Sequence, residues 1–188
     1  MREKLIHQIE EYVPFNEQEE KDRVLILEFL KNNDNAFLRT NMTAHMTASS
    51  WIVNANRTKI LAVYHKIYDS WAWTGGHADG DEDLLKVAVK EAKEETGISK
   101  VIPVSEDIYS LEILTVDGHE KHDCYVPCHL HMNITYLLQA DEEEMLHICE
   151  EENNGVSWFS YEEFAKKCTE PWFLKRIYSK LDAKLAQI

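Results

Sequence analysis

Residues 76–98 read GHADGDEDLLKVAVKEAKEETGI, and this stretch decides the fold. It combines a glycine loop with one predicted helix. Glu91, Glu94 and Glu95 are spaced i, i+3 and i+4, so their side chains leave one face of that helix within a turn of each other. Three carboxylates this close repel one another unless a positive charge lies among them. A hard divalent cation, which prefers oxygen ligands, is the usual occupant of such a cluster.

The same helix also carries an apolar stripe that predicts a buried face. Three lysines define a third, solvated face, and Gly97 is a suitable residue to end the helix. Upstream, Gly75, Gly76 and Gly80 permit backbone approaches that a side chain would block. The predicted buried stripe consists of Leu85, Ala88, Val89, Ala92 and Thr96.

The stretch resembles the Nudix box, G-x5-E-x7-R-E-U-x-E-E-x-G-U, in which U is apolar. The matching positions in this chain are Gly76, Glu82, Glu91, Ala92, Glu94, Glu95, Gly97 and Ile98. The one departure is Lys90, which stands where the family has arginine. An ordinary surface helix with a run of charges would account for the number of glutamates, but not for the paired glycines or the register.

The resemblance implies a role for each matched residue. Glu91, Glu94 and Glu95, with the backbone carbonyl of Gly75, would bind metal. Glu82 would support the loop or a second ion. Either Glu91 or Glu94 would take the proton of the attacking water, and the sequence leaves that choice open. Lys90 would orient a glutamate with a point-like charge in place of the planar arginine fork.

The reaction that the resemblance implies is hydrolysis of a pyrophosphate bond in a nucleoside diphosphate derivative. This chemistry requires charge neutralisation on the phosphates and a positioned water. Mg²⁺, or Mn²⁺ in its place, is the expected cofactor for ligands that are all oxygen.

Composition limits the partners and the location of the chain. Its 188 residues favour one domain with a modest extension. A formal net charge of −14 argues against binding a nucleic acid polymer or an anionic membrane. The start has no apolar run of signal length, and no stretch is long enough to span a bilayer, so we expect a cytoplasmic protein. The four cysteines complete no zinc pattern, and we expect reduced thiols.

Two helices are predicted in an N-terminal extension, residues 1–35, ahead of a Nudix domain at 36–188. Pro14 separates the helices, and Asn16 with Glu19 has capping-box spacing. We weigh three roles for this extension: a lid, a dimerisation arm that would make a homodimer, and a segment that simply packs on the domain, which is favoured.

Strands are predicted at residues 43–53, 59–65, 70–74, 111–115, 128–140 and 155–159. Residues 119–127 are expected to be a loop near the site, and 141–154 an acidic connection. A capped helix after Ser160 and a last helix from Trp172 to about Leu185 complete the chain. Strands interrupted by one central helix and followed by others predict an α/β fold, here the α/β/α sandwich of the family with a mixed sheet.

Substrate contacts are predicted at His129, His131, Trp73 and Glu151. His129 and His131 share one strand face with Asn133, and His77 and His119 are loop residues of similar standing. With Cys128 beside them, the histidines suggest a zinc site. Cys128, however, points to the opposite face of the strand. We therefore favour histidines that line the substrate cleft or pack against the sheet. Trp73 could stack on a base, although each tryptophan is more often a core residue. Glu151, among Glu150–Glu152, could add a carboxylate from a late loop.

Three classes of function compete. A metal-dependent pyrophosphohydrolase leads. An isomerase resembling isopentenyl diphosphate isomerase would need a cysteine segment upstream of the box, and none is present. A non-catalytic nucleotide-sensing Nudix domain would usually lack box glutamates, and this chain keeps them all.

Overall fold

The structure is a computed structural model that describes residues 1–121, 124–149 and 153–188. Its helices are α1 (Arg2–Glu11), α2 (Glu17–Asn32), α3 (Leu84–Thr96), α4 (Tyr161–Lys167), α5 (Pro171–Phe173), a π-helical turn η1 (Leu174–Tyr178) and α6 (Ser179–Leu185). Its strands are β1 (Ala44–Val53), β2 (Ile60–His65), β3 (Ser70–Ala72), β4 (Thr74–His77), β5 (Val101–Pro103), β6 (Ser110–Val116), β7 (His119–Lys121), β8 (Cys124–Val126), β9 (His129–Ala140) and β10 (Asn153–Phe159).

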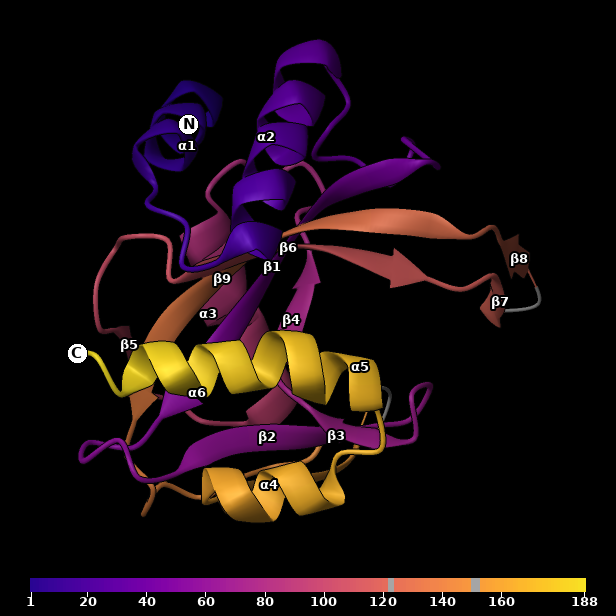
Figure 1. The fold of residues 1–188 in the computed structure, drawn as a ribbon. Helices are drawn as coiled ribbons and strands as arrows, with labels where there is room; N and C mark the ends of the chain where they lie inside the picture. The colour runs from indigo at the N-terminus through magenta and orange to yellow at the C-terminus, as the bar shows by residue number, and fades with distance from the viewer. Residues whose placement is uncertain (122–123, 150–152) are drawn as a thin grey trace.

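One mixed sheet of eight strands forms the centre of the molecule (Figure 1). Its main path is β10-β2-β1-β9-β5, with β3 paired to β2, β4 to β1 and β6 to β9. β1 and β9 run parallel, and the other pairs are antiparallel. Helix α3 lies on one face and the C-terminal helices lie on the other (Figure 1). The predicted α/β/α architecture with a mixed sheet and N-terminal helices is confirmed.

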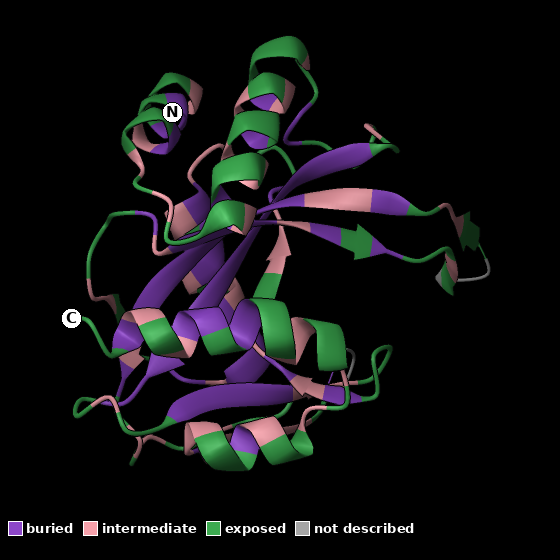
Figure 2. Ribbon diagram, viewed as in Figure 1, coloured by how far each residue is buried: buried purple, intermediate pink, exposed green. Residues whose placement is uncertain are grey.

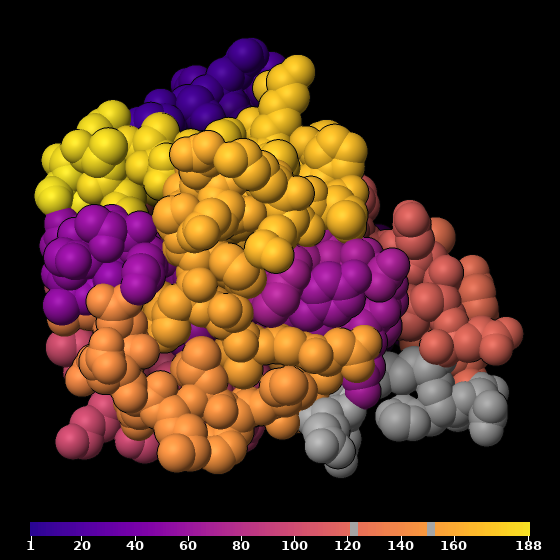
Figure 3. All heavy atoms as spheres, turned by 90° about the horizontal axis from the view of Figure 1, so that it is seen from below, coloured from indigo at the N-terminus to yellow at the C-terminus, as the bar shows by residue number. Residues whose placement is uncertain are grey.

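Two apolar clusters fill the space on either side of the sheet. Alternate residues of β1 supply both, since Met46, Ala48 and Ile52 face the first cluster while Trp51 and Val53 face the second. The first cluster also receives side chains of α1, α2 and α3, and the second receives those of η1 and α6. Figure 2 shows the resulting burial along the strands and the inner helix faces. Seen from below, α4 and the C-terminal helices form much of the surface (Figure 3).

Helix α3 begins and ends where its sequence indicates. Asp83 caps its first turn by accepting the Lys86 N–H at 3.2 Å, and Gly97 ends it with φ +74°. The buried stripe is rotated slightly from the predicted one. Leu84 and Val87 are buried, whereas Leu85 and Val89 are only half-buried, where α3 packs against the neighbouring strands β4, β1, β9 and β5 of the sheet.

Several short elements differ from prediction. Residues 119–127 contain the hairpin β7–β8 in place of a loop. This hairpin projects from the ends of β6 and β9 (Figure 1) and exposes Tyr125, so it lacks the buried face that marks a strand in a sequence. The predicted strand at 70–74 is two strands, because β3 pairs with β2 whereas β4 pairs with β1. The three-residue β5 was not predicted.

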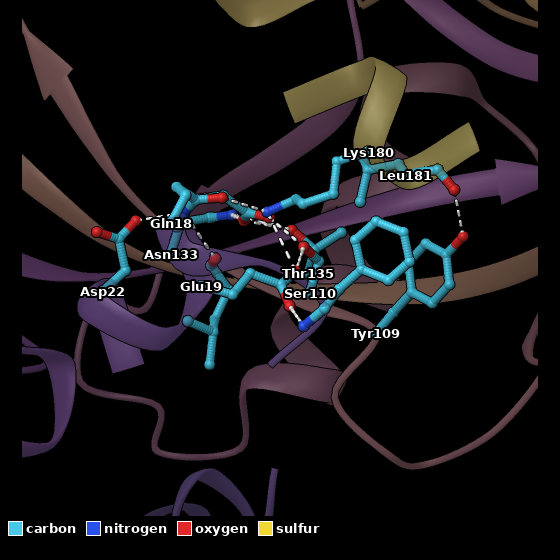
Figure 4. Close-up of polar contacts among 12 residues, drawn as sticks. Gln18, Glu19, Asp22, Tyr109, Ser110, Asn133, Thr135, Lys180 and Leu181 are labelled. Carbon is cyan, nitrogen blue, oxygen red and sulfur yellow. Dashed lines mark hydrogen bonds and ion pairs between the residues drawn. The ribbon is translucent and has the colours of Figure 1, made fainter. Parts of the chain in front are cut away.

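A buried polar network joins the N-terminal and C-terminal helices to β6 (Figure 4). Glu19 of α2 accepts hydrogen bonds from Ser110 at 2.8 Å and from Tyr12 at 2.7 Å, and Lys180 lies 3.2 Å from its carboxylate. Asn16 caps α2 as predicted, but the Glu19 side chain turns to the Phe15 N–H and this network instead of closing a capping box. The extension therefore packs on the domain.

Two further findings concern membrane-spanning helices and the cysteines. Among the described residues, no helix combines the length and apolar character needed to cross a membrane. All four cysteines are free thiols, as expected.

Candidate active site

The glycines of β4 bring this strand directly against α3. The Gly75 N–H donates to Glu95 Oε1 at 2.8 Å. A Cβ at Gly76 would lie 2.5 Å from Glu91 Cδ, so only glycine leaves the carboxylate its present place. Glu95 is 3 % exposed, and its other oxygen lies 3.4 Å from Asn153 Nδ2. Gly75, Gly76 and His77, which were expected in a loop, thus belong to strand β4, and this strand lies against the helix edge that carries the glutamates.

Lys90 lies between two of the three glutamates. Its Nζ is 3.0 Å from Glu91 Oε1 and 3.0 Å from Glu94 Oε2. Hydrogen bonds to Glu94 and Glu91 raise the pKa of Lys90 well above its ordinary value. Glu91 is mostly buried, whereas Glu94 is about half exposed. The carboxylate pair thus already holds one positive charge.

Glu82 has a different environment from these glutamates. Its carboxylate accepts the backbone N–H of Arg2 at 2.9 Å and lies 3.6 Å from the amino terminus. This contact ties the loop before α3 to the start of α1, and it agrees with a supporting role for Glu82 in the loop.

Of the other predicted substrate contacts, Trp73 packs against the core and Glu151 lies outside the residues that the structure describes. Trp73 packs edge-on against Tyr178, with ring centroids 5.6 Å apart, in the second apolar cluster. Glu151 and its neighbours Glu150 and Glu152 lie outside the described residues. Earlier in the acidic connection at 141–154, Glu142 pairs with Lys59 at 2.6 Å and Glu144 accepts the Ser99 N–H at 2.7 Å, so both carboxylates have partners away from the candidate site.

His129 and His131 belong to a cluster of four histidines, with His45 and His77. One nitrogen of each ring lies within 4.8 Å of the corresponding nitrogen of every other ring. His45 lies at the start of β1, and His77 is the last residue of β4. His129 and His131 lie at the start of β9. Cross-strand pairing explains the convergence, because His45 pairs with His131, and Thr47 of the same face pairs with His77.

The cluster is largely shielded from water. His45 and His129 are buried, while His77 and His131 are half-buried. Burial, followed by the neighbouring histidines, lowers the pKa of His131 to about 2, and burial also lowers the pKa of His45. Both rings are therefore neutral at physiological pH and keep a nitrogen lone pair available.

Sequence reasoning singled out three of these histidines but not His45. The available signal was period-two spacing: His45 and Thr47 on one predicted strand, and His129, His131 and Asn133 on another. What the spacing could not supply was the parallel pairing of those two strands, which are about eighty residues apart in the chain.

Comparison with known proteins finds a matching family model, a curated relative and solved structures with the same fold. A family model described as NUDIX domain matches residues 43–181. A curated protein of Lactococcus lactis subsp. cremoris named "Probable DHNTP pyrophosphohydrolase" is 27 % identical over 149 residues, which cover 77 % of this chain and 82 % of that protein.

Solved structures share the fold at lower identity. An Ap4A hydrolase of C. elegans in a binary complex has a TM-score of 0.53 at 21 % identity, covering 76 % of this chain and 98 % of its own. The MutT protein of Methanosarcina mazei Go1 has a TM-score of 0.54 at 20 % identity, with coverage of 76 % and 95 %. The E. coli dihydroneopterin triphosphate pyrophosphohydrolase has a TM-score of 0.52 at 13 % identity, with coverage of 76 % and 96 %.

Proposed function

The chain belongs to the Nudix family and is a pyrophosphohydrolase of that family, and we propose that it requires Mg²⁺ or Mn²⁺ and cleaves a pyrophosphate bond in a nucleoside diphosphate derivative. The observation that carries the proposal is the contact of β4 with α3. Gly76 leaves room for the Glu91 carboxylate, and the Gly75 N–H holds Glu95 in place.

The residues at this contact fit a hard divalent cation. The proposed donors are the carboxylates of Glu91, Glu94 and Glu95 and the carbonyl of Gly75, which are all oxygen. Lys90 supports the fit, because its ammonium already lies 3.0 Å from both Glu91 and Glu94 and so marks a place where the structure stabilises positive charge. When bound, the metal would neutralise phosphate charge and lower the pKa of a coordinated water.

The chain's own groups have three further tasks in this proposal. Glu91 or Glu94 accepts the proton of the attacking water. Lys90 holds these two carboxylates in a fixed relation, and Glu82 fixes the loop before α3 through its bond to the Arg2 N–H. Glu95, buried and hydrogen-bonded to Gly75, keeps β4 at a constant distance from the helix.

The names of the related proteins suggest the first substrates to test. One relative and one solved structure carry names that include DHNTP or dihydroneopterin triphosphate, and another solved structure is titled an Ap4A hydrolase. We therefore rank a triphosphate of a pterin or nucleoside first, and a dinucleoside polyphosphate second.

An activity screen tests the proposal. The full chain is incubated with dihydroneopterin triphosphate, the common nucleoside triphosphates and diadenosine tetraphosphate, with Mg²⁺, with Mn²⁺ or with a chelator. We expect turnover of at least one substrate only when a divalent metal is present. Glu94→Gln and Glu95→Gln should remove nearly all of that turnover while the protein remains folded.

Glu28→Gln is the matched control, because Glu28 is an exposed glutamate on α2. It should retain full activity. Turnover that survives both Glu94→Gln and Glu95→Gln, or turnover in chelator equal to that in Mg²⁺, would contradict the proposed metal site.

A further inference from the structure

We propose that the four-histidine cluster, His45, His77, His129 and His131, is a second metal site, which binds one Zn²⁺ ion or a similar late first-row divalent ion through imidazole nitrogens. This site is separate from the proposed carboxylate site in its ligands and chemistry. Imidazole is a ligand suited to Zn²⁺ and related ions, whereas Mg²⁺ prefers oxygen.

Backbone hydrogen bonds set the tautomers that metal binding needs. His45 Nδ1 lies 3.1 Å from the carbonyl oxygen of Asn41, and His129 Nδ1 lies 2.8 Å from that of Pro127. Because a carbonyl can only accept, each Nδ1 must carry the proton, and each Nε2 is left with a lone pair. A ring that donates one N–H to a carbonyl and offers the other nitrogen is the usual form of a metal-binding histidine.

One nitrogen of the cluster lacks a partner within the parts of the chain that the structure describes. His45 Nε2 is buried and has no hydrogen-bond partner among the described residues. A buried polar atom without a partner costs free energy, so its presence calls for an explanation such as an ion. A bound cation would satisfy this lone pair and would be coordinated together by one nitrogen from each of the other three rings.

The spacing of the nitrogens agrees with tetrahedral coordination. His129 Nε2 and His131 Nε2 are 3.2 Å apart, a hydrogen bond in which the neutral His131 ring donates to His129 Nε2 when no ion is bound. Two nitrogens bound to one tetrahedral Zn²⁺ lie about 3.3 Å apart, given Zn–N bonds of about 2.0–2.1 Å. All four nitrogens lie within 4.8 Å of one another, so binding of one ion requires only the wider pairs to move closer together.

The position of the cluster indicates what the ion does. Its ligands come from the starts of β1 and β9 and the end of β4, so one ion would tie together three strands that are distant in the chain. In Figure 1 this is the side of the molecule where β6 and β9 extend toward the β7–β8 hairpin. Four protein ligands close a tetrahedral site, and such closed sites stabilise folds. His77 directly follows Gly76, so the ion would also hold β4 beside α3.

Metal binding is measured on the full chain after any affinity tag has been removed and the protein has been stripped with a chelator. Zn²⁺ is titrated by calorimetry in millimolar Mg²⁺, so that hard-ion sites are filled. We expect uptake of one equivalent of Zn²⁺ and a rise in Tm, since an ion that binds only the folded state stabilises it. Co²⁺ in place of Zn²⁺ should give the strong visible absorption of tetrahedral nitrogen coordination.

Variants then separate the two metal sites. His45→Gln and His131→Gln should each lower Zn²⁺ affinity by more than the roughly 10- to 100-fold that loss of a ligand's outer partner causes, whereas His7→Gln, at an exposed histidine of α1, should leave it unchanged. Glu94→Gln should retain Zn²⁺ uptake. The proposal would be overturned if the wild type showed no stoichiometric Zn²⁺ uptake. It would also be overturned if both cluster variants took up Zn²⁺ as well as the wild type does. If the variants fail to fold, the Co²⁺ spectrum of the wild type decides, and an octahedral spectrum overturns it.

Discussion

Lys180 Nζ lies 2.9 Å from Glu112 Oε1, and the two side chains are only 3 % and 0 % exposed. The pair therefore joins the C-terminal helix to β6 inside the molecule. Glu112 also accepts hydrogen bonds from Asn133 at 3.1 Å and Thr135 at 2.9 Å, so its remaining oxygen is satisfied as well (Figure 4). Removing one partner of a buried ion pair leaves the other charge buried and uncompensated.

Removing the lysine should therefore destabilise the protein strongly. Lys180→Met leaves the charges of Glu112 and Glu19 buried without this partner, and we expect a loss of about 3–5 kcal/mol in the free energy of unfolding. Urea denaturation measures it. Lys175→Met is the matched control at an exposed lysine of the preceding turn and should change stability by less than about 0.5 kcal/mol. Equal stability of the two variants would contradict a structural role for the pair.

Stability should also depend on the ionisation of Glu19. Burial alone would raise the pKa of this carboxyl, but Lys180, Lys184 and the Phe15 N–H outweigh it and hold the pKa below the ordinary 4.5. The unfolded state thus binds a proton before the folded state does. The stabilisation is fully present above about pH 4.5 and is lost as the pH falls through the lower folded pKa.

Glu19→Gln tests this dependence. The variant should be less stable than the wild type at pH 7, and the difference should shrink as the pH falls below 4.5. Glu20→Gln, at the exposed neighbour, should show a constant small difference. Unfolding curves at several pH values measure both, and a difference for Glu19→Gln that does not change with pH would refute the assignment.

Two adjacent glycines should respond differently to alanine. At Gly76 the added Cβ meets the end of the flexible Glu91 side chain at 2.5 Å, so the carboxylate moves and the fold survives. At Gly75 it meets Ser49 Oγ at 2.5 Å and the Ala48 carbonyl oxygen at 2.7 Å, so the backbone must shift. We expect Gly76→Ala to keep its Tm and lose most activity, and Gly75→Ala to lose about 1–3 kcal/mol of stability. Full activity in Gly76→Ala would show that Glu91 need not hold its place.

Lys90 provides a test of the departure from the family motif. Lys90→Arg keeps the charge between Glu91 and Glu94 and restores a planar fork, so kcat/KM should stay the same or rise. Lys90→Met removes the charge and should lower kcat/KM by about 10- to 100-fold, as expected when a partner that orients metal ligands is lost. Lys93→Met, at the exposed lysine of the next turn, is the control. A large fall in Lys90→Arg would mean that the compact ammonium has a task that arginine cannot perform.

Local patterns predicted much of the fold. Gly97 ends α3 as expected, and Ser160 with Glu163 forms a capping box at the start of the predicted capped helix. β1, β2, β6, β9 and β10 lie at or within two residues of their predicted limits, because alternation and helical spacing are properties of neighbouring residues. The hairpin β7–β8 and the short β5 were missed, since neither has a long run of alternating polarity.

By itself the sequence determined the end of the helix at Gly97, the register of Glu91, Glu94 and Glu95 on that helix, and the architecture that the box implies. Only the tertiary structure decided that Lys90 lies between two of those glutamates, that Glu19 and Lys180 meet in the interior, and that His45 joins His77, His129 and His131. The reason is physical: spacing along the chain orients side chains on one element, whereas strand pairing and helix packing determine which distant elements become neighbours.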